Sequence, residues 1–141
     1  MYRLLTPTTP EEWEAYHSIR EHVLWIARGR VGVYDRRHQD EYAPGHYPLL
    51  LTYGQRHVAV ARLDVKGDVA WLRRVAVASD VQRHGHGRAL LNYVQRLAAE
   101  KGCIAIRSNV DPGAVDFYLR NGFRRLDIGA GGASVPMEKL L

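Results

Sequence analysis

The chain has 141 residues, of which 46% are apolar and 25% are charged, and its formal net charge is +5. This balance excludes a globally disordered chain, and the length fits one domain over residues 1–141. Met1 to Pro10 lacks the features of a signal peptide, no apolar run approaches the ~20 residues of a membrane-spanning helix, and a single cysteine excludes an intrachain disulfide, so we expect a cytoplasmic protein without membrane attachment.

The first half of the chain predicts a strand, a helix, an irregular segment and a strand meander. A short strand at Tyr2 to Thr6 precedes Thr9, a good N-cap, and a helix is expected from Pro10 to Ala27. Its apolar face comprises Trp13, Tyr16, Ile19, Val23 and Ile26. Residues 28–48 show weak periodicity, and such long irregular segments are often functional. Strands are then expected at Leu49–Tyr53, Arg56–Asp64 and Val69–Ala78, with a turn at Val65–Asp68.

The second half alternates helices and strands. The range Gly85–Lys101 predicts a helix that Gly102 ends, with Leu90, Leu91, Val94, Leu97 and Ala98 on its apolar face. A strand at Cys103–Ser108 follows, in which Cys103 is expected to be a buried hydrophobe rather than a reactive thiol. A second helix is expected at Pro112–Asn121, with Asp111 as N-cap and Gly122 as the C′ residue, and a final antiparallel pair at Phe123–Ile128 and Ser134–Leu140 around a turn at Gly129–Gly132.

A meander followed by strand, glycine-rich turn, helix, strand and helix predicts an α/β (α+β) fold, a mixed sheet with helices on its faces. The turn reads Gln82-Arg83-His84-Gly85-His86-Gly87 and lies between the strand and the helix. Unpaired N–H groups at a helix start bind anions, and glycines let a phosphate approach the backbone closely. Arg83 and Arg88 add charge, so a pyrophosphate is the expected ligand.

Two other phosphate-binding motifs do not fit this turn. A dinucleotide fingerprint needs a third glycine, and position 90 is Leu; a Walker A loop needs Gly-Lys-Ser/Thr, which is absent. His84 and His86 alone are too few ligands for a metal site, so no metal is expected.

Two blocks resemble the GCN5-related N-acetyltransferase (GNAT) superfamily. The glycine turn, with Leu72 to Val77 before it and Ala89-Leu90-Leu91 after it, is similar to the coenzyme A motif of that family. The run Ala114-Val115-Asp116-Phe117-Tyr118-Leu119-Arg120-Asn121-Gly122-Phe123 resembles its A-x-x-F-Y-x-x-x-G-F helix. The close match covers about Leu72 to Arg124, with both blocks in the family's order. The resemblance implies the acyl-CoA N-acyltransferase fold, a mostly antiparallel central sheet splayed at a bulge.

The resemblance also implies an acetyl-CoA-dependent N-acetyltransferase that acts on a primary amine of a small molecule, peptide or protein. The pyrophosphate would lie on the backbone from Arg83 to Arg88, the pantetheine arm along Val75 to Val77, and Tyr118 would protonate the departing thiolate. The implied cofactor-binding residues are Val75, Ala76, Val77, Gln82, Arg83, His84, Gly85, His86, Gly87, Arg88, Asp111, Phe117 and Tyr118. Asp111 stands where many relatives have Asn, which puts its contact to the pantetheine arm in doubt. The resemblance is also compatible with a homodimer.

The sequence says less about the residues that would bind and deprotonate the acceptor amine. The strand Trp71-Leu72-Arg73-Arg74 carries no acid, so the general base is water or a residue of the irregular segment: Asp35, Asp40, Glu41, His38 or His46, each more simply a solvated loop residue. Arg73 and Arg74 are expected to face opposite sides of the strand, one pointing into the cleft, where it could bind a carboxylate or phosphate of the acceptor.

Three other functions are compatible with some of these features. The chain could bind coenzyme A without catalysis, as a sensor, or use another acyl-CoA such as a succinyl or longer-chain donor. Nucleic-acid binding is disfavoured, because the basic residues are interspersed with acids and no helix-turn-helix or aromatic-basic platform is evident.

Overall fold

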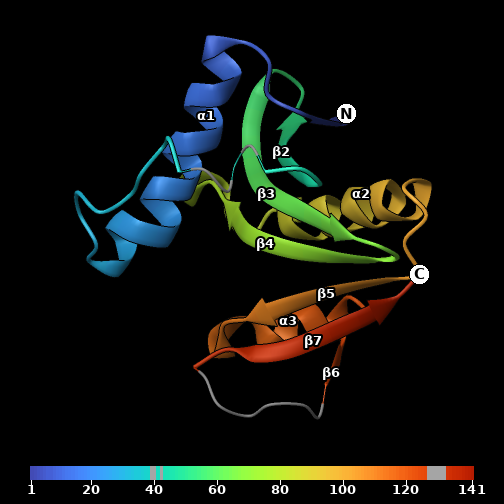
Figure 1. The fold of residues 1–141 in the computed structure, drawn as a ribbon. Helices are drawn as coiled ribbons and strands as arrows, with labels where there is room; N and C mark the ends of the chain where they lie inside the picture. Colours follow the sequence, from blue (N-terminus) through green and yellow to red (C-terminus); the bar gives the residue numbers. More distant parts are fainter. Residues whose placement is uncertain (39–40, 42, 127–132) are drawn as a thin grey trace.

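The computed structural model describes residues 1–38, 41, 43–126 and 133–141 (Figure 1). In this part of the chain seven strands form one sheet in the order β1-β2-β3-β4-β5-β7-β6. Neighbouring strands are antiparallel except β4 and β5, which are parallel, so the predicted mixed, mostly antiparallel sheet is confirmed. The strands are β1 (Tyr2–Leu5), β2 (His46–Tyr53), β3 (Arg56–Lys66), β4 (Val69–Val77), β5 (Ala105–Val110), β6 (Arg124–Arg125) and β7 (Val135–Leu140).

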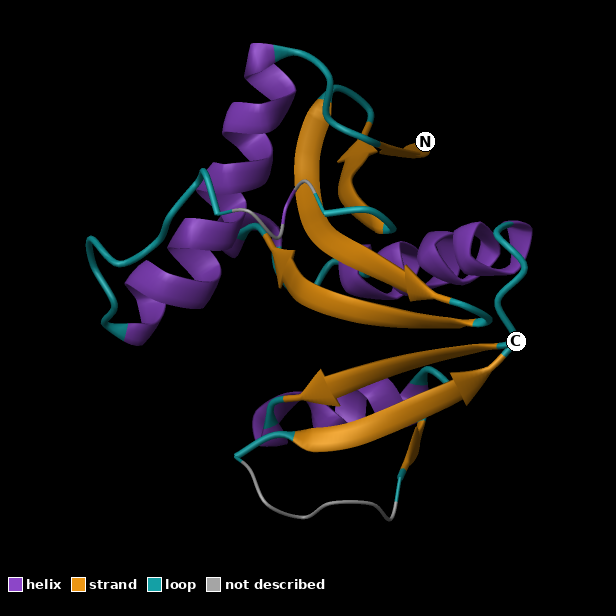
Figure 2. Cartoon of the chain, viewed as in Figure 1, coloured by secondary structure: helices purple, strands orange, loops and turns teal. Residues whose placement is uncertain are grey.

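Helices flank the sheet, as Figure 2 shows. They are α1 (Pro10–Arg20), the π-helix η1 (Glu21–Trp25), the 3₁₀ turns η2 (Ile26–Arg28), η4 (Ser79–Val81) and η5 (Pro112–Ala114), and α2 (His86–Glu100) and α3 (Val115–Arg120). Among the described residues, no helix has the length and apolarity needed to cross a bilayer.

The first helical segment begins as predicted but changes type before it ends. The Thr9 side chain accepts from the Glu12 backbone N–H, and the Glu12 carboxylate accepts from the Thr9 N–H, which forms a capping box. After Arg20 the chain widens into the π-helix and then tightens into a 3₁₀ turn. This change alters the phase of the side chains, so Ile26, expected on the buried face, is 39% exposed. The predicted helical extent from Pro10 to Ala27 is therefore confirmed, while the prediction that Ile26 lies on its buried face is wrong.

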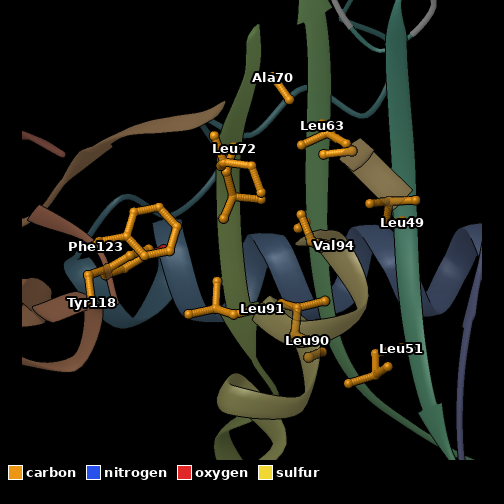
Figure 3. Close-up of a cluster of buried hydrophobic side chains, with 14 of the residues drawn as sticks. Leu49, Leu51, Leu63, Ala70, Leu72, Leu90, Leu91, Val94, Tyr118 and Phe123 are labelled. Atoms are coloured by element: carbon orange, nitrogen blue, oxygen red, sulfur yellow. The ribbon is translucent and has the colours of Figure 1, made fainter. Parts of the chain in front are cut away.

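Two hydrophobic clusters lie on opposite faces of the sheet, because successive residues of a strand point to opposite faces. Leu49, Leu51 and Leu63 pack with the apolar face of α2, while Leu50 and Val60 pack with Tyr16 of α1. The α2 face holds the larger cluster, in which Leu90, Leu91 and Val94 are all at most 1% exposed (Figure 3). Helices α1 and α2 therefore cover opposite faces of the sheet.

A β-bulge at Arg74 reverses this alternation within β4. Arg62 pairs with Arg73, and Val60 pairs with Ala76, so Arg74 and Val75 together oppose the single residue Ala61. Arg74 has a φ of +56°, which few non-glycine residues adopt. Before the bulge Leu72 faces α2; after it, Ala76 faces α1. The bulge that the family resemblance implied is thus present.

Helices α2 and α3 both end in Schellman motifs, and each motif determines where the next strand begins. Gly102 has a φ of +84°, its N–H donates to Ala99 O, and the Cys103 N–H donates to Ala98 O. Cys103 is therefore still part of the helix end, and β5 begins at Ala105, two residues later than predicted. Cys103 is buried, and burial raises the pKa of its thiol, as expected of a hydrophobe.

Other boundaries also differ from the predictions. Strand β3 continues to Lys66, which leaves Gly67 with a φ of +60° as the turn residue before Asp68. Within the described part of the segment expected to be a strand at Phe123–Ile128, Arg124 and Arg125 pair with β7, and the Leu126 N–H donates to Pro136 O at 2.9 Å. The predicted turn at Gly129–Gly132 lies outside the described residues.

Candidate active site

A cleft of about 880 Å³ opens where β4 and β5 separate. The two strands pair only at Val69–Ala105, Ala70–Ile106 and Trp71–Arg107, although both continue beyond that point. Figure 1 shows their ribbons diverging toward the end of the α1 segment. Because neither strand pairs with the other beyond Trp71, backbone groups of β4 and β5 line the cleft and can bind an extended ligand. The predicted splay is confirmed.

The glycine turn closes one side of this cleft and forms the start of α2. Gly85 is the N-cap with a φ of +84°, and Ala89 N–H is the first to donate back to Gly85 O, at 3.1 Å. The N–H groups of His86, Gly87 and Arg88 therefore have no partner within the helix. These residues line the cleft together with Gln82 and Arg83, as do Val75, Ala76 and Val77. The arrangement can bind an anion such as a phosphate.

The two glycines of the turn are required for different reasons. A Cβ at Gly85 would meet no atom within 4 Å, so the residue is needed for its left-handed backbone. Gly87 has no such backbone, but its Cβ would lie 3.1 Å from Cζ of Phe117. Gly87 is thus needed for the close approach of α2 to Phe117 of α3, on the opposite wall of the cleft.

Replacing Gly85 with Ala should lower the free energy of unfolding by about 1–2 kcal/mol, because an L-residue pays that cost in the left-handed region. Chemical denaturation at equilibrium measures the change. Gly113→Ala is the matched control, since a Cβ there also meets open space but no positive φ is imposed. Equal stability of the two variants would contradict a conformational requirement at Gly85.

Not every residue of the predicted phosphate turn points into the cleft. The Gln82 side-chain amide donates to Val77 O at 3.1 Å, which ties the turn to the end of β4. His84 does not line the cleft; with the His86 ring it borders a second depression beside Tyr2. His86 Nδ1 lies 2.8 Å from the Tyr2 hydroxyl, so its ring is held beside Tyr2, and the residue lines both the cleft and this depression. Among the described residues no group of three His, Cys, Asp or Glu side chains could hold a metal ion.

The end of α3 fixes Tyr118 in the cleft wall. The Phe123 N–H donates to Tyr118 O and the Gly122 N–H to Leu119 O, a second Schellman motif. The turn brings the Phe123 ring against Tyr118, edge to face at 5.1 Å, and Figure 3 shows both rings in the α2-side cluster. Tyr118 is 6% exposed. Its phenol lines the cleft from a buried, rigid position.

Burial sets the protonation state of this phenol. It raises the pKa of Tyr118 to about 12, while a hydrogen bond with Ser108 lowers it and the nearby Asp111 carboxylate raises it. The Ser108 hydroxyl donates to Leu72 O at 2.9 Å, which joins β4 to β5 just where their pairing stops. Sequence reasoning missed Ser108, although a hydroxyl in an apolar strand is a signal, because a buried hydroxyl needs a partner. The phenol is held protonated at neutral pH and can donate a proton.

Asp111 stands at the predicted N-cap position but does not cap with its side chain. The turn is closed instead by the Ala114 N–H, which donates to Asp111 O at 2.9 Å. The carboxylate pairs with Arg28 at 2.6 Å, from the end of the α1 segment. Both residues line the cleft, so this exposed pair connects its two walls. The side-chain cap predicted for Asp111 is therefore wrong.

None of the four described candidates for the general base lines the cleft. Asp35 accepts from the Arg37 N–H in a local turn, and His46 lies 3.6 Å from Asp64. Asp40 lies outside the described residues. Glu41, expected to be a solvated loop residue, is 4% exposed and belongs to a buried ion network. That expectation is wrong because the Glu41 carboxylate is bound in the interior by Tyr16 and Arg20 of α1.

The buried ion network consists of Arg20, Glu41, Arg62 and Asp64, with Tyr16 and Arg73 as further partners. Glu41 pairs with Arg20 and accepts from the Tyr16 hydroxyl at 2.8 Å. Arg62 donates two bonds to Asp64, at 2.7 and 2.9 Å. Burial raises the pKa of Tyr16, so its phenol remains a donor. The network joins α1 and Glu41 to β3 beneath the cleft.

Arg73 and Arg74 both line the cleft, so the expectation that only one would do so is wrong. The bulge is the reason, because it removes the alternation on which the expectation relied. Arg73 is held in a structural ion pair with Asp64 at 3.0 Å. The Arg74 guanidinium lies over the ring of Trp25, 5.2 Å from its centroid. Trp25 was not identified from the sequence; it belongs to the π-helix, an element that often marks functional sites.

Comparisons with known proteins agree with this geometry. The model of the acetyltransferase (GNAT) family matches residues 1–123. The fold is similar to the ribosomal-protein-S18-alanine N-acetyltransferase of Escherichia coli, with a TM-score of 0.77 and 20% identity over 99% of this chain and 94% of that one. It is also similar to the PaiA N-acetyltransferase of Thermoplasma acidophilum, solved with coenzyme A, with a TM-score of 0.74 and 18% identity over 100% and 99% of the two chains.

Proposed function

Because the chain belongs to the acetyltransferase (GNAT) family, we propose that it is an acetyl-CoA-dependent N-acetyltransferase acting on a primary amine of a small molecule, peptide or protein. One observation carries the proposal: the cleft between β4 and β5 extends from the free N–H groups of α2 to the phenol of Tyr118. A pyrophosphate on the helix start and a thioester at the phenol fit the two ends. The solved relative with coenzyme A supports this ligand.

In the proposed reaction the acceptor nitrogen attacks the thioester carbonyl carbon. A C–N bond forms, the C–S bond breaks, and Tyr118 gives its proton to the departing thiolate sulfur. The proton that the acylated nitrogen then loses restores the phenol of Tyr118 through water. The high pKa of Tyr118 supports this assignment, because the phenol is protonated when the thiolate forms. A proton donor in the cleft also favours catalysis over coenzyme A sensing.

The acceptor ammonium must lose a proton before its nitrogen attacks, and we propose that water accepts this proton. Among the described residues Asp111 is the only carboxylate that lines the cleft, and it is paired with Arg28. Arg30, Arg73 and Arg74 also line it, and their positive charge lowers the pKa of an ammonium bound nearby. The cleft itself therefore favours the neutral, nucleophilic amine. The cytoplasmic location stays a prediction from the sequence, and the homodimer stays compatible with the family resemblance.

Thermal unfolding with and without acetyl-CoA tests the donor site. A ligand at a hundred times its dissociation constant stabilises the native state by roughly 2.7 kcal/mol, which raises the midpoint by several degrees. We expect this rise with acetyl-CoA and with coenzyme A, and none with NAD, because the turn lacks a dinucleotide fingerprint. No rise at millimolar acetyl-CoA would overturn the proposed function.

A further inference from the structure

Positive charge accumulates in the cleft beyond what a coenzyme A pyrophosphate requires. Arg83 and Arg88 flank the glycine turn and suit that group. A second set, Arg28, Arg30, Arg73 and Arg74, lines the part of the cleft formed by β4 and the continuation of α1. Because α1 and α2 cover opposite faces of the sheet, this second set faces the side from which an acceptor would meet the thioester.

Two members of the second set already have carboxylate partners. Arg28 pairs with Asp111 at 2.6 Å, and Arg73 with Asp64 at 3.0 Å. Arg74 has no carboxylate partner among the residues that the structure describes; its guanidinium stacks on Trp25 instead. Desolvation and the neighbouring Arg20, Arg62 and Arg73 lower the pKa of Arg74, and the Glu41 carboxylate only partly offsets them. An anion bound there would offset the repulsion from these arginines.

The backbone directs Arg74 to this position. A φ of +56° costs free energy for any residue with a Cβ, and such strain is concentrated at functional sites. The strain comes with a bulge that re-aims the side chain, a recurrent device next to active sites. The guanidinium carbon lies over the ring of Trp25, and a guanidinium placed on an aromatic ring can still donate two parallel bonds to an oxyanion.

We propose that Arg74 anchors an anionic group of the acceptor, so that the acceptor is a primary amine that also carries a carboxylate or a phosphate. The inference rests on the proposed function and deepens it. The anion occupies Arg74, while the amine, repelled as an ammonium by the same arginines, reaches the thioester in its neutral form. Arg74 thus positions the acceptor and takes no part in proton transfer.

The test uses pairs of acceptors that differ only in the anion. Amino acids are compared with their carboxamides, and phosphoethanolamine with ethanolamine, at equal concentrations of unprotonated amine, by following thiol release from acetyl-CoA. At least one anionic member should exceed its neutral counterpart about 10- to 100-fold in kcat/KM, the range expected for a hydrogen bond to a charged group. The pair that responds distinguishes carboxylate from phosphate.

Variants then assign the effect to Arg74. Arg74→Gln should remove the preference by raising KM for the anionic acceptor with little change in kcat, and Arg74→Lys should restore part of it. Arg96→Gln is the matched control, since Arg96 also stacks on an aromatic ring, 5.4 Å from the centroid of Tyr93, but does not line the cleft. It should keep the full preference.

The rise in unfolding midpoint that coenzyme A causes shows whether the role of Arg74 alone has failed or the proposed function has failed with it. If the rise is present but neutral amines react as well as anionic ones, or no anionic amine reacts, or Arg74→Gln keeps the preference, the role of Arg74 is overturned and the donor site stands. If coenzyme A does not bind, the proposed function falls and this inference falls with it.

Discussion

Tyr118→Phe is expected to lower kcat about 100-fold or more while leaving coenzyme A binding intact. General acid catalysis contributes roughly that much, and phenylalanine removes the proton while keeping the ring against Phe123. Steady-state thiol release measures kcat, and the coenzyme A-induced rise in unfolding midpoint measures the donor site. Tyr93→Phe is the matched control, because Tyr93 also loses a hydroxyl bond, to Tyr2 O at 3.4 Å, but lies on α2 outside the cleft.

The assignment of Tyr118 as the general acid also predicts how the rate depends on pH. A raised pKa keeps the phenol protonated through neutral and mildly alkaline pH, so an acid at about 12 limits the rate only near that value. The acceptor ammonium loses its proton as pH rises, so the rate of the native enzyme should rise between about pH 7 and pH 10 without a falling limb. An ordinary tyrosine would begin to ionise near pH 10 and bend the profile downward.

Tyr118→Phe should retain the rising limb at a lower rate, since the amine still titrates. Full turnover in this variant would show that water protonates the thiolate and would remove the acid role from Tyr118. A falling limb below about pH 9 in the native enzyme would show that a different acid is needed.

The donor side of the cleft could be predicted from the sequence because its signals are local. Gly85, Gly102 and Gly122 all adopt positive φ at a helix end, where glycine is preferred, and the capping box at Thr9 lies within three residues. A helix start after a buried strand is likewise a short-range pattern. Such signals depend on neighbours in the chain, so composition and spacing reveal them.

The acceptor side could not be predicted, because its determinants are tertiary. No glycine or asparagine marks Arg74 as a residue with positive φ; the pairing of β3 with β4 imposes it. Trp25 reaches the cleft through a π-helix that has no sequence pattern of its own. Glu41 is surrounded by irregular sequence, yet its partners are Arg20 on α1 and Arg62 on β3, 21 residues away in each direction. Only the fold brings these residues together.

Glu41→Gln is expected to lower the free energy of unfolding by about 3–5 kcal/mol, because it leaves buried guanidinium charge without its counter-ion. Arg20 is 3% exposed and Arg62 6%, so water cannot replace the lost carboxylate. The midpoint of thermal unfolding should fall by on the order of 10 °C. Glu14→Gln is the control: Glu14 pairs with Arg36 at the surface, where it is 62% exposed, and its loss should leave the midpoint of unfolding nearly unchanged.

A double variant, Arg20→Met with Glu41→Leu, tests whether the fold requires the buried charges themselves or only requires that each buried charge has a counter-ion. Removing both charges avoids the uncompensated Arg20, so the double variant should lose less stability than Glu41→Gln alone. If Glu41→Gln is no worse than the surface control, the network does not hold α1 to the sheet. If it is worse and the double variant recovers stability but loses acceptor turnover, the buried ions are needed chiefly to place the π-helix and Trp25 beside Arg74. That outcome would connect the polar interior beneath α1 to the chemistry of the cleft.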